Sequence, residues 1–201
     1  MKEKIIVTAI MSVFTVTTLM GFDARAMAVG NELVIADFNT GDKPNNIGGD
    51  FGTWDKDPAD DTQKAQMKFE PDDALGNPAG YSIRLDYDVH SPNPAYNGFW
   101  MMLKEVDATP YNCLTFYLKG DSKAGYTKRI KIELKDKANK PSAYILKNVT
   151  NEWQKFSIPF EKFSRIQDWK ALSEFVVVFD DANSNPKTGT IYLDQVVLSK
   201  Q

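Results

Sequence analysis

The sequence predicts an all-β fold in which two antiparallel sheets pack as a sandwich. From residue 33 onward, short runs alternate apolar and polar side chains with a period of two, which is the pattern of half-buried strands. Clusters of Gly, Asn, Asp and Pro separate these runs, and no long helical pattern interrupts them. Short strands joined by turns bury their apolar faces by packing sheet against sheet around one core.

The expected strands follow one another closely along the chain. Between the first and the second of them, an irregular loop rich in Gly and Asp is expected at about 39–63, and helix is expected only as a turn or two around 168–172. The expected strands span residues 33–38, 64–69, 81–89, 98–103, 114–118, 130–134, 144–149, 153–158, 174–180 and 190–198.

Alternation within these strands separates core positions from outward positions. In the strand at 81–89, apolar residues such as Ile83 and Leu85 share one face, and charged residues occupy the other. The strands at 114–118 and 130–134 repeat this pattern. The run at 98–103 is apolar on both faces, as expected for a strand whose outer face is covered or binds something.

The first 28 residues have the features of a Sec-type signal peptide. Lys2 and Lys4 precede an apolar stretch at 5–22, and Ala24-Arg25-Ala26 and Ala26-Met27-Ala28 supply small residues for cleavage. We therefore expect a signal peptide at 1–28, a single β-sandwich domain at 29–201, and a periplasmic or secreted protein with no membrane attachment after cleavage.

Charge and cysteine content narrow the partners and the chemistry. The formal net charge is −3 and no Lys/Arg run occurs, so binding to nucleic acid or to an anionic membrane surface is not expected. The single cysteine, Cys113, cannot form an internal disulfide and is expected to be a buried thiol in a strand. A monomer is expected.

No constellation for nucleophilic or zinc catalysis is present in the sequence. His90 is the single histidine and lies beside Ser91-Pro92, so neither a Ser/Cys triad nor a Cys–His zinc site is expected. A Gly-rich phosphate loop is also missing. Abundant carboxylates leave one enzymatic alternative open, because two carboxylates at a suitable separation can hydrolyse a glycosidic bond.

Aromatic residues favour a different function. Sugar rings present apolar C–H faces that stack on Trp and Tyr, while their hydroxyls pair with polar side chains. Packing against the core or the sheet is the competing role for each aromatic residue. The residues placed near loops or opposite the expected core are Trp54, Tyr96, Trp100, Tyr117 and Tyr126.

Acidic segments could also bind a hard cation. Ca²⁺ takes several oxygen ligands from carboxylates, amides and backbone carbonyls, and the segments 37–42, 55–61 and 180–185 are rich in Asp and Asn. None of them is an EF-hand loop. The same residues also form turns, so composition alone leaves both interpretations open.

The order of several motifs resembles a known superfamily. The motifs are Val34-Ile35-Ala36-Asp37-Phe38, Asn45-Asn46-Ile47-Gly48-Gly49, Gly52-Thr53-Trp54, Leu114-Thr115-Phe116-Tyr117-Leu118-Lys119-Gly120-Asp121, Glu152-Trp153-Gln154-Lys155-Phe156-Ser157-Ile158-Pro159-Phe160 and Gly189-Thr190-Ile191-Tyr192-Leu193-Asp194-Gln195-Val196. Together they resemble the galactose-binding-like β-sandwich superfamily, in particular the family 11 carbohydrate-binding modules and the complex I intermediate-associated protein family.

The resemblance implies a jelly-roll that is usually non-catalytic, with a structural Ca²⁺ near the first and last strands. The matching positions for the metal are Asp37, Asn39 and Asp194. The resemblance also implies a ligand groove on one sheet face. The matching outward residues, with Trp100 added from the aromatic set, are Arg84, Asp86, Asp88, Trp100, Tyr117, Arg129, Lys131 and Glu133.

These observations favour an exported carbohydrate-binding module without an active site. The expected ligand face is more charged and less aromatic than a glucan groove, which keeps a protein-interaction or assembly factor as the second hypothesis. A free-standing glycoside hydrolase is the third. The expected partner is therefore a carbohydrate or a protein.

Overall fold

The computed structural model describes residues 30–76 and 80–201. The predicted signal peptide at 1–28 lies outside the described residues. The described chain is all-β, as predicted, and its strands are β1 (Glu32–Ala36), β2 (Phe51–Asp55), β3 (Lys64–Glu70), β4 (Ser82–Asp88), β5 (Tyr96–Val106), β6 (Cys113–Gly120), β7 (Arg129–Asp136), β8 (Ser142–Lys147), β9 (Gln154–Pro159), β10 (Leu172–Asp180) and β11 (Thr188–Ser199).

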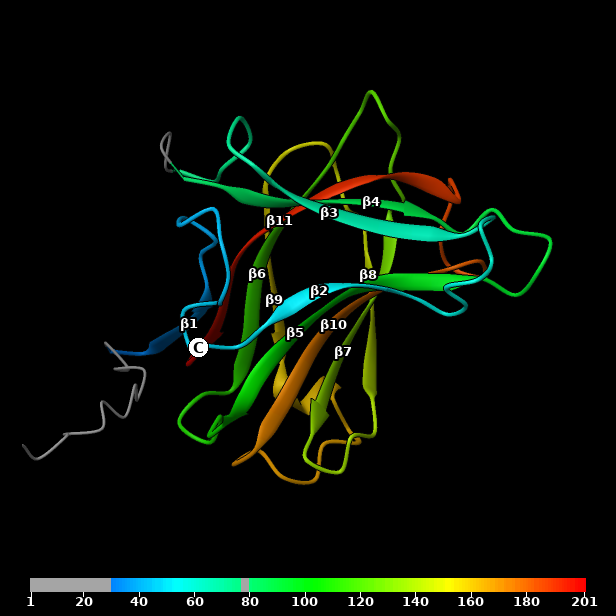
Figure 1. Cartoon of the computed structure of the whole chain (residues 1–201). Coiled ribbons are helices and arrows are strands. Elements are labelled where there is room, and N and C mark those ends of the chain that lie inside the picture. Colours follow the sequence, from blue (N-terminus) through cyan, green and yellow to red (C-terminus); the bar gives the residue numbers. More distant parts are fainter. Residues whose placement is uncertain (1–29, 77–79) are drawn as a thin grey trace, which may run out of the picture.

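The strands form two antiparallel sheets that pack face to face (Figure 1). The six-stranded sheet has the order β3-β4-β11-β6-β9, with β1 pairing beside β11. The five-stranded sheet has the order β2-β5-β10-β7-β8. From β4 to β7 successive strands alternate between the sheets, and the late strands β11 and β10 each lie between strands that come much earlier. This is the jelly-roll sandwich that the sequence predicted.

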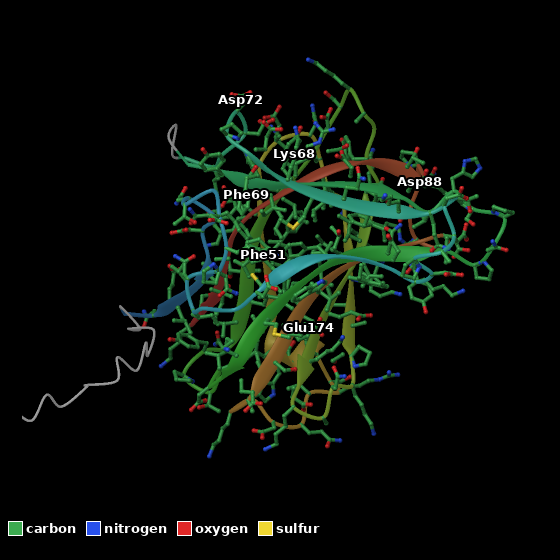
Figure 2. All side chains as sticks on the ribbon, in the orientation of Figure 1. Phe51, Lys68, Phe69, Asp72, Asp88 and Glu174 are labelled. Carbon is green, nitrogen blue, oxygen red and sulfur yellow. The ribbon has the colours of Figure 1, made fainter. Side chains whose placement is uncertain are left out.

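The core lies between the sheets and is filled by the inward side of the period-two pattern. Ile83 and Leu85 of β4, which the sequence placed in the core, are buried together with Phe116 and Ile132. The sheets also meet at the edge formed by β2 and β3, where Phe51 contacts Phe69 edge to ring at 6.0 Å (Figure 2). The resulting core is continuous from one end of the sandwich to the other.

Three local features refine the expectations from the sequence. The segment expected as an irregular loop at 39–63 contains β2. The expected helix around 168–172 is instead a turn closed by the Ala171 N–H donating to the Asp168 carbonyl (3.2 Å). A single 3₁₀ turn lies earlier, at Phe160–Lys162.

Cys113 is buried, as expected, and burial raises the pKa of its thiol. Across residues 30–76 and 80–201, no helix has the length and apolarity to span a membrane.

Candidate functional site

The outer face of the five-stranded sheet carries side chains in rows that run across the strands. In antiparallel pairs, opposite residues point to the same face, so the register shows which side chains are neighbours. The central row contains Gly52 of β2, Trp100 of β5, Val176 of β10, Glu133 of β7 and Ala143 of β8. This row brings an aromatic ring and a carboxylate onto one surface.

A tryptophan pair occupies the β2–β5 side of this surface. The half-buried Trp100 lies over Gly52, where an added Cβ would be 3.3 Å from Trp100 Nε1. Trp54 lies two residues further along β2, and its ring contacts that of the exposed Tyr96 edge to face, with 5.7 Å between the ring centroids. Glycine at position 52 therefore leaves room for an indole to rest on β2.

A groove extends from these indoles across the sheet. Its volume is about 490 Å³, within the range of small-molecule sites. From β2 to β7 it crosses three strand spacings, or roughly 14 Å, enough for about three sugar rings in a row. The lining residues are Trp54, Trp100, Met102, Glu133, Lys135, Asn139, Pro141, Glu174 and Val176.

Ion pairs border the groove on its β7 side. Lys135 Nζ contacts Glu174 Oε2 at 2.5 Å, and Lys131 Nζ contacts Asp180 Oδ2 at 2.8 Å. Figure 2 shows Glu174 on β10 of this sheet. Both lysines and both of these acids are thus satisfied within the protein.

Glu133 differs from its charged neighbours. Within the part of the chain that the structure describes, its carboxylate has neither an ion pair nor a hydrogen bond. Burial raises the pKa of Glu133, an effect that Lys131 and Lys135 oppose and that Glu174 and Asp180 reinforce. The groove therefore contains one carboxylate whose acceptor atoms are available to a ligand.

The outer face of the six-stranded sheet is polar but internally paired. Arg84 Nη2 contacts Asp86 Oδ1 at 2.9 Å, and the Thr190 hydroxyl donates to the same oxygen at 2.5 Å. The Tyr192 hydroxyl donates to Asp121 Oδ2 at 2.9 Å. These side chains form a network that stabilises the surface without a ligand.

The predicted ligand residues divide between these two faces, although the sequence grouped them in one groove. Trp100 and Glu133 line the groove of the five-stranded sheet, and Arg129 lies at the start of β7 on the same face. The remaining predicted residues belong to the six-stranded sheet and lie on the opposite side of the sandwich; they are Arg84, Asp86, Asp88 and Tyr117.

Asp88 and Arg129 have local roles. Asp88 Oδ1 accepts a hydrogen bond from the His90 N–H at 2.8 Å, so its carboxylate closes the turn that follows β4, at the far end of that strand in Figure 2. Arg129 Nη2 donates to Asn183 Oδ1 at 3.4 Å, outside the groove. Neither residue contacts the tryptophan pair, Trp54 and Trp100, in the described structure.

The predicted metal residues Asp37 and Asp194 lie close enough to interact electrostatically. Asp194 is 1% exposed and lies at a bulge in β11, where Oδ2 accepts from the Leu75 N–H (2.9 Å) and Oδ1 from the Gln195 N–H (2.7 Å). Burial raises its pKa to about 6, and the charge of Asp37 adds to this effect. A buried carboxylate beside a second carboxylate fits the oxygen donor set of Ca²⁺.

Few other side chains are placed to complete this set of calcium ligands. Asn39 follows Asp37, and its N–H donates to Asp37 Oδ1 at 3.1 Å. In residues 30–76 and 80–201, no group of three or more His, Cys, Asp and Glu side chains converges on one point. Backbone carbonyls and the Asn39 amide would have to supply the remaining ligands for calcium.

The other acidic segments form turns. Asp60 accepts hydrogen bonds from Thr62, Gln63 and Asn93, and these neutral donors hold its pKa well below the ordinary range. Asp180 accepts from Asn183 and pairs with Lys131. Turn formation, the alternative role considered for these residues, accounts for both.

Several groove residues escaped the sequence prediction. Met102 has the same outward orientation as Trp100 two positions earlier, and it is 49% exposed. That period-two spacing could have identified Met102 beforehand. Glu174, Asn139 and Pro141 reach the groove through strand pairing and a turn, which the sequence does not reveal.

Comparison with protein families gives one match that covers most of the chain. Residues 45–200 match the model of carbohydrate binding domain 30. No curated protein matches the chain in sequence.

Solved structures share the fold. The family 11 carbohydrate-binding module of a cellulosomal cellulase of Clostridium thermocellum is 18% identical, with a TM-score of 0.60, 87% of this chain covered and 97% of that one. The Clostridium thermocellum family 11 module in complex with a β-1,3-1,4-mixed-linked tetrasaccharide is 16% identical, with a TM-score of 0.59 and coverage of 85% and 96%. The xylan-binding domain CBM22-1 of Paenibacillus barcinonensis is 12% identical, with a TM-score of 0.50 and coverage of 87% and 99%.

Proposed function

The chain belongs to the carbohydrate binding domain 30 family and is a carbohydrate-binding module, and we propose that it holds its glycan in the groove of the five-stranded sheet. One observation carries this location: Trp54 and Trp100 lie side by side at one end of a groove that continues across β10 to β7. Sugar rings would stack on these indoles, and hydroxyls would pair with polar residues further along.

The opposite face is a poorer candidate. Its charged groups already pair with one another, as in the Arg84–Asp86 contact, so a ligand would have to replace existing interactions. The groove instead offers exposed apolar area at Met102 and an acceptor at Glu133 that has no partner among the described residues. Binding on the groove side therefore gains more contacts than it disrupts.

We propose further that the module binds without hydrolysing its ligand. Glycosidases of the common type need a carboxylic acid and a second carboxylate on either side of the scissile bond. Two carboxylates line this groove among the described residues, Glu133 and Glu174. Glu174 is ion-paired with Lys135, so Glu133 is the one carboxylate of the two that is unpaired. An unchanged oligosaccharide profile after long incubation would support this proposal, and new reducing ends would contradict it.

Affinity gel electrophoresis against a panel of neutral and acidic glycans tests the proposal. A first probe is the β-1,3-1,4-mixed-linked glucan, since a structural neighbour forms a complex with such a tetrasaccharide. We expect retardation by at least one glycan in the panel. Absence of retardation across the panel, together with recovery of a stoichiometric protein partner from the envelope fraction, would favour the protein-interaction hypothesis instead.

We also propose that the protein is exported and acts as a monomer. The proposal of export rests on the basic, apolar and Ala-x-Ala features of residues 1–28. N-terminal sequencing of the protein recovered outside the cytoplasm should begin at Met27 or Val29. Recovery with Met1 intact in the cytoplasm would contradict export, and a dimer in sedimentation velocity would contradict the monomer.

A calcium ion bound by Asp37, Asn39 and Asp194 remains part of the proposal. It would hold the segment after β1 against the bulge of β11 and so brace the terminal strands. Its role would be structural, because Asp194 lies in the six-stranded sheet, Asp37 and Asn39 follow β1 of that sheet, and none of the three lines the groove.

A further inference from the structure

Glu133 lies on the β7 side of the groove, across the sheet from the two indoles. It occupies the central position of β7, and the strand register places Val176 beside it on β10 and Ala143 beside it on β8. Trp100 follows Val176 in the same row. A sugar chain extending from the indoles across the sheet would therefore pass directly over this carboxylate.

The charges around Glu133 are already neutralised by other partners. On its own strand, Lys135 is paired with Glu174 and Lys131 with Asp180, both from β10. On the β8 side, the neighbour is Ala143, which carries no charge. Each cation facing Glu133 is thus already paired, and the half-buried carboxylate has no hydrogen-bond donor among the described residues.

A half-buried acceptor of this kind affects what can bind over it. A ligand that covers the carboxylate removes it from water, and leaving the charged group unpaired there would cost about 1–3 kcal/mol or more, so the ligand must supply hydrogen-bond donors to offset that cost. A carboxylate accepts and cannot donate, and its two oxygens can receive two neighbouring hydroxyls. A ligand carboxylate at the same place would supply no donor and would add like-charge repulsion.

We propose that Glu133 sets the ligand class of the groove, selecting uncharged glycans with free hydroxyls over glycans that carry uronic acids. The inference rests on the proposed function, because it takes the groove as the glycan site. Trp54 and Trp100 supply stacking that does not depend on ligand charge. Glu133 supplies the discrimination between uncharged glycans and glycans that carry uronic acids.

The test compares one polymer in two charge states. The probes are neutral β-1,3-1,4-mixed-linked glucan and the same glucan oxidised at C6 to glucuronate, measured by affinity gel electrophoresis. The wild type should bind the neutral polymer at least tenfold more tightly than the oxidised one. Glu133→Gln keeps the side-chain size and removes the charge, so it should reduce this ratio about tenfold while changing the neutral affinity by only a few-fold.

Two further variants separate the possible outcomes. Glu70→Gln is a matched control, since Glu70 is a partly buried, ion-paired glutamate on β3 of the other sheet, and it should leave the ratio unchanged. Trp100→Ala should lose affinity for the neutral polymer. If Trp100→Ala loses binding while Glu133→Gln keeps the wild-type ratio, the selectivity inference is overturned and the groove stands; if the wild type binds no glycan, or Trp100→Ala binds normally, both fail.

The pH dependence of binding gives a second readout. Charge-assisted acceptance requires the ionised carboxylate, so wild-type affinity for the neutral glucan should fall as pH drops through the raised pKa of Glu133. Glu133→Gln should lack this fall. The paired groups that face Glu133, Lys131 and Lys135 with Asp180 and Glu174, are present in both proteins, so a parallel pH profile in the variant would contradict the inference.

Discussion

Replacing Trp100 with alanine should weaken glycan binding about tenfold. A fully covered Trp side chain buries roughly 150–250 Å², and because the sheet already buries most of Trp100, on the order of 50 Å² remains for a ligand to cover. At about 25 cal/mol per Å², covering that area contributes about 1.3 kcal/mol. Each 1.4 kcal/mol corresponds to about tenfold in the dissociation constant.

The assay is isothermal titration with the glycan that retards the wild type most strongly. Trp153→Ala is the matched control, since Trp153 is also half-buried but lies beside Lys119 of the six-stranded sheet, with the ammonium 5.7 Å from the ring centroid. It should bind within twofold of the wild type. Near-wild-type affinity in Trp100→Ala, or a large loss in Trp153→Ala, would refute the assignment of the groove.

Three further changes test the groove, the metal and the core. Gly52→Val should weaken glycan binding about tenfold in titration and leave the melting temperature unchanged. The reason is that a branched side chain with its Cβ 3.3 Å from Trp100 Nε1 would displace the indole. Unchanged affinity would contradict the packing of Trp100 over Gly52. Chelation should lower the melting temperature by about 5–10 °C, and added Ca²⁺ at about a hundredfold over its dissociation constant should restore it. Asp194→Asn should show neither change. A wild-type melting temperature that does not change on chelation would contradict the calcium proposal. Phe175→Ala should lower the free energy of unfolding in urea by about 3–5 kcal/mol, because Phe175 is fully buried, and a loss below about 1 kcal/mol would contradict its place in the core.

The strands could be predicted from sequence because each encodes its own alternation. In β4, Ile83, Leu85 and Tyr87 face inward by side-chain period alone, and the structure buries all of them. β2 was missed because its sequence contains Gly52 and lacks a clear apolar alternation. Its place in the sheet depends on pairing with β5, a contact between distant parts of the chain.

The site could be predicted only in part, for a related reason. Alternation shows that Tyr117 and Glu133 point away from the core, but it does not show which sheet each strand joins. β6 joins the six-stranded sheet and β7 the five-stranded sheet, so their outward residues lie on opposite sides of the molecule. Trp100 and Glu133 come together because β10, a late strand, inserts between β5 and β7.

Backbone amide shift mapping on addition of the glycan tests the central claim most directly. Binding in the groove should shift the amides of Trp54, Trp100, Glu133 and Val176 and leave those of the opposite face in place. Shifts concentrated at Arg84, Asp86 and Tyr117 would instead place the ligand on the six-stranded sheet and contradict the account.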